Sequence, residues 1–143
     1  MVYVDGNGIP LSLITESAQV SEFRLALPTI DAVEVPDRPL HPKKRAELLV
    51  ADKGYDAKWL REAIRERNIK PKIPKKRKKG EIDEPHYNQT ITEYYRTRWI
   101  VERTISWFGA YRRLLIRWER QDDVYEAFVM IACSMFCLRR VLI

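Results

Sequence analysis

The sequence has few of the residues that build disulfide or zinc sites. Its 143 residues include two cysteines and two histidines. Cys133 and Cys137 stand four residues apart in an apolar stretch, so they are expected to pack as small hydrophobic side chains on one face of a helix. His41 and His86 are distant in the sequence, which leaves the ligand count below that of a structural zinc site. A disulfide-stabilised or zinc-dependent fold is therefore not expected.

A long hydrophobic run is also missing. The strongest candidate, residues 128–138, is well short of the ~20 apolar residues that a membrane-spanning helix needs, and Glu126 and Arg139 bound it. The N-terminus lacks the positively charged segment and apolar run of a secretory signal. We therefore expect a cytoplasmic protein with no membrane partner, in which residues 128–138 belong to a buried helix.

Positive charge is what the sequence has in excess. It contains 26 Lys and Arg residues against 20 Asp and Glu residues, a formal net charge of +6. Lys and Arg neutralise phosphates and release counterions, which favours a nucleic-acid partner. On charge alone, an ordinary basic soluble protein is the alternative. The length and the 45% hydrophobic content suit one domain with a real core, so we expect a single domain over residues 1–143.

Hydrophobic patterning predicts an α/β fold. Two β-rich runs, 2–5 and 10–15, flank Gly6-Asn7-Gly8 and predict an antiparallel hairpin. A strand at 47–51, a helix capped by Asp56 and running to Asn68, and a strand at 69–74 predict parallel pairing across a helical crossover. The remaining expected elements are a short helix within 20–33 that ends near Pro28, a surface connection at 34–42, a long helix at about 92–114 and a last helix at 124–142.

Three acidic residues occupy positions that suit metal-dependent chemistry on a phosphodiester. Asp5 ends the first strand, Asp52 ends the strand 47–51, and Glu102 lies on the long helix, away from its main apolar stripe of Tyr94, Val101, Ile105 and Phe108. Acids at the carboxyl ends of parallel neighbouring strands would meet at one sheet edge. Divalent cations offset the resulting repulsion by binding the oxygens that they prefer, so Mg²⁺ or Mn²⁺ is expected.

Each acid also has a plainer interpretation. Asp52 alone could be a polar strand terminator, and Arg98 with Glu102 could be a surface ion pair between residues i and i+4 of a helix. The combination of three acids, each on a suitable element, favours the catalytic interpretation.

The residues around the acids form recognisable motifs. These are Val4-Asp5-Gly6-Asn7-Gly8-Ile9-Pro10-Leu11, Asp52-Lys53-Gly54-Tyr55-Asp56 and Tyr95-x-x-Arg98-x-x-x-Glu102, followed by Arg112-Arg113-Leu114, Ala127-Phe128 and Leu138-Arg139-Arg140. In this order they resemble the DDE transposases of bacterial insertion sequences, and the resemblance covers nearly the whole chain.

The resemblance implies a ribonuclease H-like mixed sheet flanked by helices. It also implies Mg²⁺- or Mn²⁺-dependent DNA strand cleavage and strand transfer during insertion-sequence transposition, with Asp5 bridging two ions, Asp52 on one and Glu102 on the other. Arg98 would either orient Glu102 or contact a phosphate. The expected partners are double-stranded DNA, at the element ends and at the target, and a second copy of the chain in an active homodimer. The expected DNA-binding residues are Tyr95, Arg98, Arg112, Arg113 and the basic run Lys75, Lys76, Arg77, Lys78 and Lys79, which belongs to a mobile loop at about 75–89.

Three departures from the family pattern qualify the expectation. Gly109 replaces a common Lys, Ser21-Glu22 replaces a common His-Asp pair, and only four residues precede Asp5. We therefore expect a truncated first strand and no N-terminal DNA-binding domain, which an upstream-frame transposase partner would supply. Two alternatives stay open: an inactive or truncated transposase remnant that acts only as a basic DNA-binding domain, and a ribonuclease H-like nuclease without strand transfer.

Overall fold

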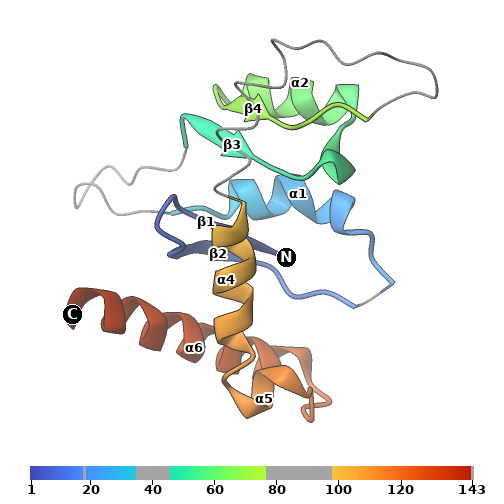
Figure 1. Cartoon of the computed structure of the whole chain (residues 1–143). Helices are drawn as coiled ribbons and strands as arrows, with labels where there is room; N and C mark the ends of the chain where they lie inside the picture. Colours follow the sequence, from blue (N-terminus) through green and yellow to red (C-terminus); the bar gives the residue numbers. More distant parts are fainter. Residues whose placement is uncertain (18, 35–45, 77–97, 143) are drawn as a thin grey trace.

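The computed structural model describes residues 1–17, 19–34, 46–76 and 98–142, and its architecture is mixed α/β (Figure 1). In chain order the elements are β1 (Val2–Val4), β2 (Pro10–Leu13), α1 (Glu22–Asp31), β3 (Leu48–Val50), the 3-10 turn η1 (Lys53–Tyr55), α2 (Lys58–Glu66), β4 (Lys70–Lys72), α4 (Trp99–Phe108), α5 (Arg112–Leu115) and α6 (Asp122–Leu142). The predicted α/β class is confirmed. None of the described helices combines the length and apolarity that crossing a membrane requires.

The predicted hairpin is present. β1 and β2 pair antiparallel, with Val2 opposite Leu13 and Tyr3 opposite Ser12, and the register shifts before Val4. The turn ends at Gly8, whose φ of 86° lies in the left-handed region that glycine adopts without strain. Asp5 is therefore presented at the start of a tight turn.

The predicted parallel pair is present as well. β3 and β4 pair in parallel from Leu48 opposite Lys70 to Val50 opposite Lys72, and α2 is the crossover between them. Packing of α1 and α2 on these strands forms the main hydrophobic core (Figure 1). Its buried members are Ala26, Ile30, Leu49, Leu60, Ile64, Ile69 and Ile73.

The strands that lead to Asp5 and Asp52 are not neighbours in the described sheets. Parallel pairing of β1 and β3 would have brought these acids to one sheet edge, but the two strands lie in two separate two-stranded sheets, β1–β2 and β3–β4. Each of the two strands is three residues long, so pairing between them would add only a few hydrogen bonds. Side chains from both strands instead line a pocket that lies between the sheets.

Helix α1 continues past the proline at which it was expected to end. Pro28 lies inside α1, and the helix runs to Asp31. The hydroxyl of Thr29 donates a 2.7 Å hydrogen bond to the Leu25 carbonyl, and Ala32 N–H donates to the Pro28 carbonyl. Burial of one face of the helix, including Thr29 and Ile30, outweighs the hydrogen bond that proline cannot make.

The N-terminus of α2 also differs from the expectation. Its N-cap is Ala57, not Asp56, and Ala57 makes no side-chain capping bond. The Asp56 carboxylate instead accepts hydrogen bonds from Arg61 Nε at 2.8 Å and from Lys76 N–H at 2.6 Å. Asp56 thus ties the start of the basic run to α2.

The long helix expected at about 92–114 is broken. Among the described residues, α4 ends at Phe108, and after Gly109 the chain turns into the short helix α5. Glycine favours this break because it is a poor helix former. Val101, Glu102 and Ile105 all line one pocket, so the pocket borders both arcs of the helix.

The last predicted helix is confirmed as α6, but it is less buried than expected. Among its described residues, only Val129 and Ala132 are fully buried, and Phe136 contacts Trp107 of α4 with ring centroids 4.5 Å apart. Cys133 and Cys137 are free, half-buried thiols, and burial raises the pKa of the Cys133 thiol. The exposed apolar residues of α6 are Val124, Met130, Ile131, Met135, Leu138, Val141 and Leu142.

Candidate functional site

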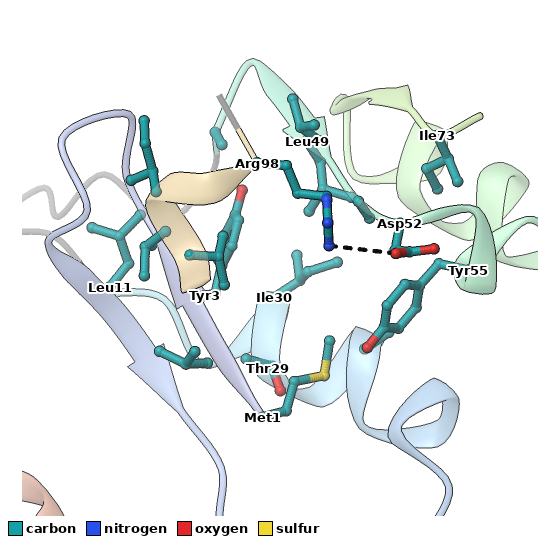
Figure 2. A pocket seen from close by; sticks show the side chains of 18 of the residues that line it. Met1, Tyr3, Leu11, Thr29, Ile30, Leu49, Asp52, Tyr55, Ile73 and Arg98 are labelled. Atoms are coloured by element: carbon teal, nitrogen blue, oxygen red, sulfur yellow. Dashed lines mark ion pairs between the residues drawn. The ribbon is translucent and has the colours of Figure 1, made fainter. Parts of the chain in front are cut away.

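A pocket of about 790 Å³ lies between the two sheets. Its walls come from the hairpin, α1, the β3 segment and the first turns of α4 (Figure 2). Most of the lining is apolar and includes Tyr3, Ile30, Leu49 and Ile73. The three acids predicted to be catalytic, Asp5, Asp52 and Glu102, all contribute to the lining, together with Arg98.

Asp52 reaches the pocket from the end of β3. Its Oδ1 accepts a 2.8 Å hydrogen bond from Gly54 N–H, which caps the η1 turn. Its Oδ2 lies 3.6 Å from Nη1 of Arg98, and Figure 2 shows the guanidinium of Arg98 extended toward this carboxylate. One oxygen of Asp52 therefore orders the turn, and the other faces a cation.

Arg98 joins the second and third acids. Its Nη2 is 2.8 Å from Oε1 of Glu102, one turn further along α4. Because its other terminal nitrogen reaches Asp52, a single guanidinium forms ion pairs with both carboxylates. The three side chains are about 38%, 43% and 59% exposed for Arg98, Asp52 and Glu102, so solvent can reach all of them.

Asp5 is oriented differently from the other two acids. Its Oδ1 accepts hydrogen bonds from the N–H groups of Asn7 and Ile9, each 2.8 Å long. This is the local side-chain-to-backbone pattern by which Asp stabilises turns. Within the described ranges, no three side chains among His, Cys, Asp and Glu lie close enough to hold a metal ion together. Asp52 and Glu102 therefore both pair with the guanidinium of Arg98. Asp5 lines the same pocket, but its Oδ1 is hydrogen-bonded to its own turn.

Contacts join the turn that follows Asp5 to α4, the helix that carries Glu102. Thr104 is buried, and its hydroxyl donates a 2.8 Å hydrogen bond to the Gly8 carbonyl. Nη2 of Arg103 donates to the Asn7 carbonyl at 3.0 Å. The turn that follows Asp5 is therefore docked directly on the helix that carries Glu102.

Two further polar residues of the pocket were not identified from the sequence. Tyr55 donates a 3.4 Å hydrogen bond to Glu22, and both side chains line the pocket. Burial, and then the nearby Glu22 carboxylate, raise the pKa of Tyr55 to about 12. Two signals could have pointed to them: Tyr55 belongs to the motif that starts at Asp52, and Glu22 stands where the resemblance places the acid of a His-Asp pair.

The predicted DNA-binding residues are spread over the molecule. Arg112 and Arg113 lie on α5 and do not line the pocket. Arg113 forms a 2.6 Å ion pair with Glu119 and lies over the ring of Phe128 at 4.9 Å, which gives it a packing role. Lys75 and Lys76 follow β4, with the backbone of Lys76 held by Asp56. Arg77, Lys78, Lys79 and Tyr95, and most of the loop predicted at 75–89, lie outside the described residues.

Comparisons with known proteins identify the family of the chain. Residues 1–137 match the family model described as a transposase DDE domain. Over 138 residues the chain is 38% identical to a putative transposase for the insertion sequence element IS402 from Burkholderia cepacia. The alignment covers 95% of this chain and 60% of that relative, so the chain spans about three fifths of the relative's length. No solved structure matches the chain. The family match over almost the whole sequence, with Asp5, Asp52 and Glu102 inside it, shows that the chain belongs to the DDE-domain transposases.

Proposed function

We propose that this chain is the catalytic domain of an insertion-sequence transposase that cleaves DNA strands and joins them to target DNA. The observation that carries the proposal is that Asp52 and Glu102 both form ion pairs with the guanidinium of Arg98, at a pocket that Asp5 also lines. These two acids come from elements far apart in the sequence, so their approach is a result of folding. A chance surface ion pair along one helix would not include Asp52.

The donor chemistry of the site fits a hard divalent cation, because carboxylate oxygens are the ligands that Mg²⁺ and Mn²⁺ prefer. The placement of Asp52 and Glu102 fits as well, since both carboxylates already face the positively charged side chain of Arg98. The placement of Asp5 does not complete a three-ligand site in this arrangement. Bound metal would supply activation of a water or 3′-hydroxyl nucleophile and stabilisation of the leaving oxygen.

The pocket provides room for Asp5 to approach the other acids. β1 and β3 belong to separate sheets and both line the pocket, so a shift of the hairpin toward β3 would carry Asp5 toward Asp52. The same shift would bring the two strands toward the neighbouring positions of a ribonuclease H-like sheet. In this proposal residues 1–143 act as one catalytic domain, with Asp5, Asp52 and Glu102 as metal ligands.

DNA is the proposed substrate, at the element ends and at the target. The net charge of +6 supports binding to phosphates, and Lys75, Lys76 and Arg112 are the described residues proposed to contact the backbone. Contact with DNA also stays a prediction for four residues outside the described ranges, Tyr95, Arg77, Lys78 and Lys79. A cytoplasmic location, an active homodimer and an upstream-frame partner are also part of the proposal, and the size of the DNA-bound assembly tests the last two.

A second function, binding of DNA without cleavage, is favoured by one observation. The Oδ1 atom of Asp5 is engaged by its own turn, so a chain unable to move Asp5 would bind DNA without cutting it. Nicking of supercoiled plasmid in Mg²⁺ or Mn²⁺ separates the two functions. We expect nicking by the parent chain and none by Asp52→Ala, with unchanged DNA binding. Absence of nicking by the parent in both metals, with DNA binding equal in parent and variant, would establish the binding-only function instead.

A further inference from the structure

The ion pairs of Arg98 place a positive charge between two carboxylates of the proposed metal site. Nη1 lies 3.6 Å from Asp52 Oδ2, and Nη2 lies 2.8 Å from Glu102 Oε1. The other oxygen of Asp52 already accepts a hydrogen bond from Gly54. The guanidinium therefore faces the Asp52 oxygen that the η1 turn does not use.

We propose that Arg98 and a divalent cation compete for the carboxylates of Asp52 and Glu102, so that the cation binds as the guanidinium leaves. This inference rests on the proposed function, because it concerns the same acids. A divalent ion binds carboxylate oxygens directly at about 2.0–2.6 Å. The guanidinium uses the same oxygens and would lie within a few ångströms of the ion, where two positive charges repel each other strongly.

Exchange of the two cations is physically accessible at this position. The Arg98 side chain is partly exposed, and ion pairs of this exposure contribute little to stability. A long, flexible arginine side chain can therefore leave without unfolding α4. After this exchange, its planar guanidinium could form a bidentate contact with a phosphate. Metal binding and phosphate binding would then strengthen each other, since coupling between two ligands is reciprocal.

Calorimetric titration of the full chain with Mn²⁺ tests the competition. We expect Arg98→Met to bind Mn²⁺ about three- to tenfold more tightly than the parent, because the competing ion pairs are lost. Arg98→Lys, which keeps the charge but lacks the planar fork, should fall between them. The matched control is Arg120→Met, which removes an exposed arginine outside the pocket and should leave Mn²⁺ affinity unchanged.

A second measurement follows metal binding in the parent chain itself and uses a variant only for assignment. The Nε–H resonance of Arg98, assigned by its loss in Arg98→Lys, should shift during titration with Mg²⁺. Its midpoint should match the Mg²⁺ affinity measured by calorimetry.

The outcomes separate the two proposals. Suppose that the parent binds Mn²⁺ and that Asp52→Asn abolishes this binding. If Arg98→Met then binds Mn²⁺ no more tightly than the parent, the competition is wrong and the metal site stands. An Arg98 resonance that does not move while Mg²⁺ binds has the same meaning. If neither the parent nor Arg98→Met binds Mn²⁺, the metal-dependent function fails and the competition fails with it.

Discussion

The Thr104 hydroxyl donates a hydrogen bond to the carbonyl oxygen of Gly8 across 2.8 Å, and this contact joins α4 to the turn that follows Asp5. Gly8 fits there for two reasons. Its φ of 86° is a conformation that side-chain-bearing residues rarely adopt, and a Cβ atom at this position would lie 2.9 Å from Thr104 Oγ1. The two elements that carry Asp5 and Glu102 are thus held together at a point where only glycine packs well.

Gly8→Ala should therefore destabilise the protein. Both the backbone conformation and the close approach oppose the new methyl group, so we expect a loss of about 1–3 kcal/mol in the free energy of unfolding. Urea titration followed by circular dichroism measures this change. Gly6→Ala in the same turn is the control, because a Cβ there meets no described atom within 4 Å, and it should change stability by less than about 0.5 kcal/mol. Equal effects of the two substitutions would show that α4 does not constrain the turn.

Glu102→Gln should abolish DNA cleavage while leaving the fold intact. The Glu102 side chain is about 59% exposed, so loss of its ion pair with Arg98 should cost less than about 0.5 kcal/mol. Loss of a metal-binding carboxylate should reduce plasmid nicking on the order of 10²-fold or more. Glu62→Gln is the matched control, since Glu62 forms an exposed ion pair of the same spacing with Lys58 on α2. Nicking that survives in Glu102→Gln would remove this residue from the proposed site.

Asp56→Asn should lower stability in a pH-dependent way. Burial alone would raise the pKa of this carboxyl, but hydrogen bonds from Lys76 N–H and Arg61, with the charge of Arg61, lower it below its ordinary value. Such a carboxylate stabilises the fold fully above the unfolded-state pKa of about 3.9, and this contribution is lost as the pH falls through the lower folded-state pKa. At pH 7 we expect the substitution to cost about 1–2 kcal/mol.

Urea titrations of the Asp56→Asn variant and the parent across pH 2–7 test this linkage. The difference in the free energy of unfolding between parent and variant should shrink as the pH falls below about 4. Asp31→Asn provides the comparison, because Asp31 pairs with Arg67 at 2.6 Å but is about 53% exposed, and its cost should be smaller. A difference for Asp56→Asn that is constant over the whole pH range would contradict the assignment.

The two arginines of α5 should behave differently. Arg113→Gln removes the partner of Glu119, whose side chain is only 7% exposed, so it should lower the midpoint of urea unfolding. Arg112→Gln should leave that midpoint unchanged and reduce by about one the slope of log affinity for DNA against log salt concentration, as expected for one lost phosphate contact. Fluorescence anisotropy with labelled duplex DNA at several salt concentrations measures the slope. Identical behaviour of the two variants in both assays would contradict this division of roles.

Local patterns in the sequence predicted most of the described elements. The hairpin followed from Gly6-Asn7-Gly8, and the β3–α2–β4 unit followed from two apolar runs separated by a helical pattern. The errors arose where tertiary contacts override local preference. Pro28 did not end α1, because burial of Thr29 and Ile30 extends the helix, and Asp56 did not cap α2, because Arg61 and Lys76 bind it instead.

The candidate site was predictable in its members and less so in its geometry. The motifs identified Asp5, Asp52 and Glu102, and all three line one pocket. A sequence pattern does not contain the distance between sheets, however, so neither the separation of β1 from β3 nor the reach of Arg98 from Glu102 to Asp52 could be anticipated. Glu22 and Tyr55 were missed because their meeting depends on the packing of α1 against the η1 turn.

The separation of the sheets leaves two inner strand edges. Among the described residues, β1 pairs only with β2, and β3 pairs only with β4. Each of the two strands therefore has one edge along which no described strand is hydrogen-bonded to it. Such edges can template the addition of strands from other molecules. Mild heating at high concentration should therefore favour β-rich aggregates, and shielding these edges is a way to keep the protein in solution.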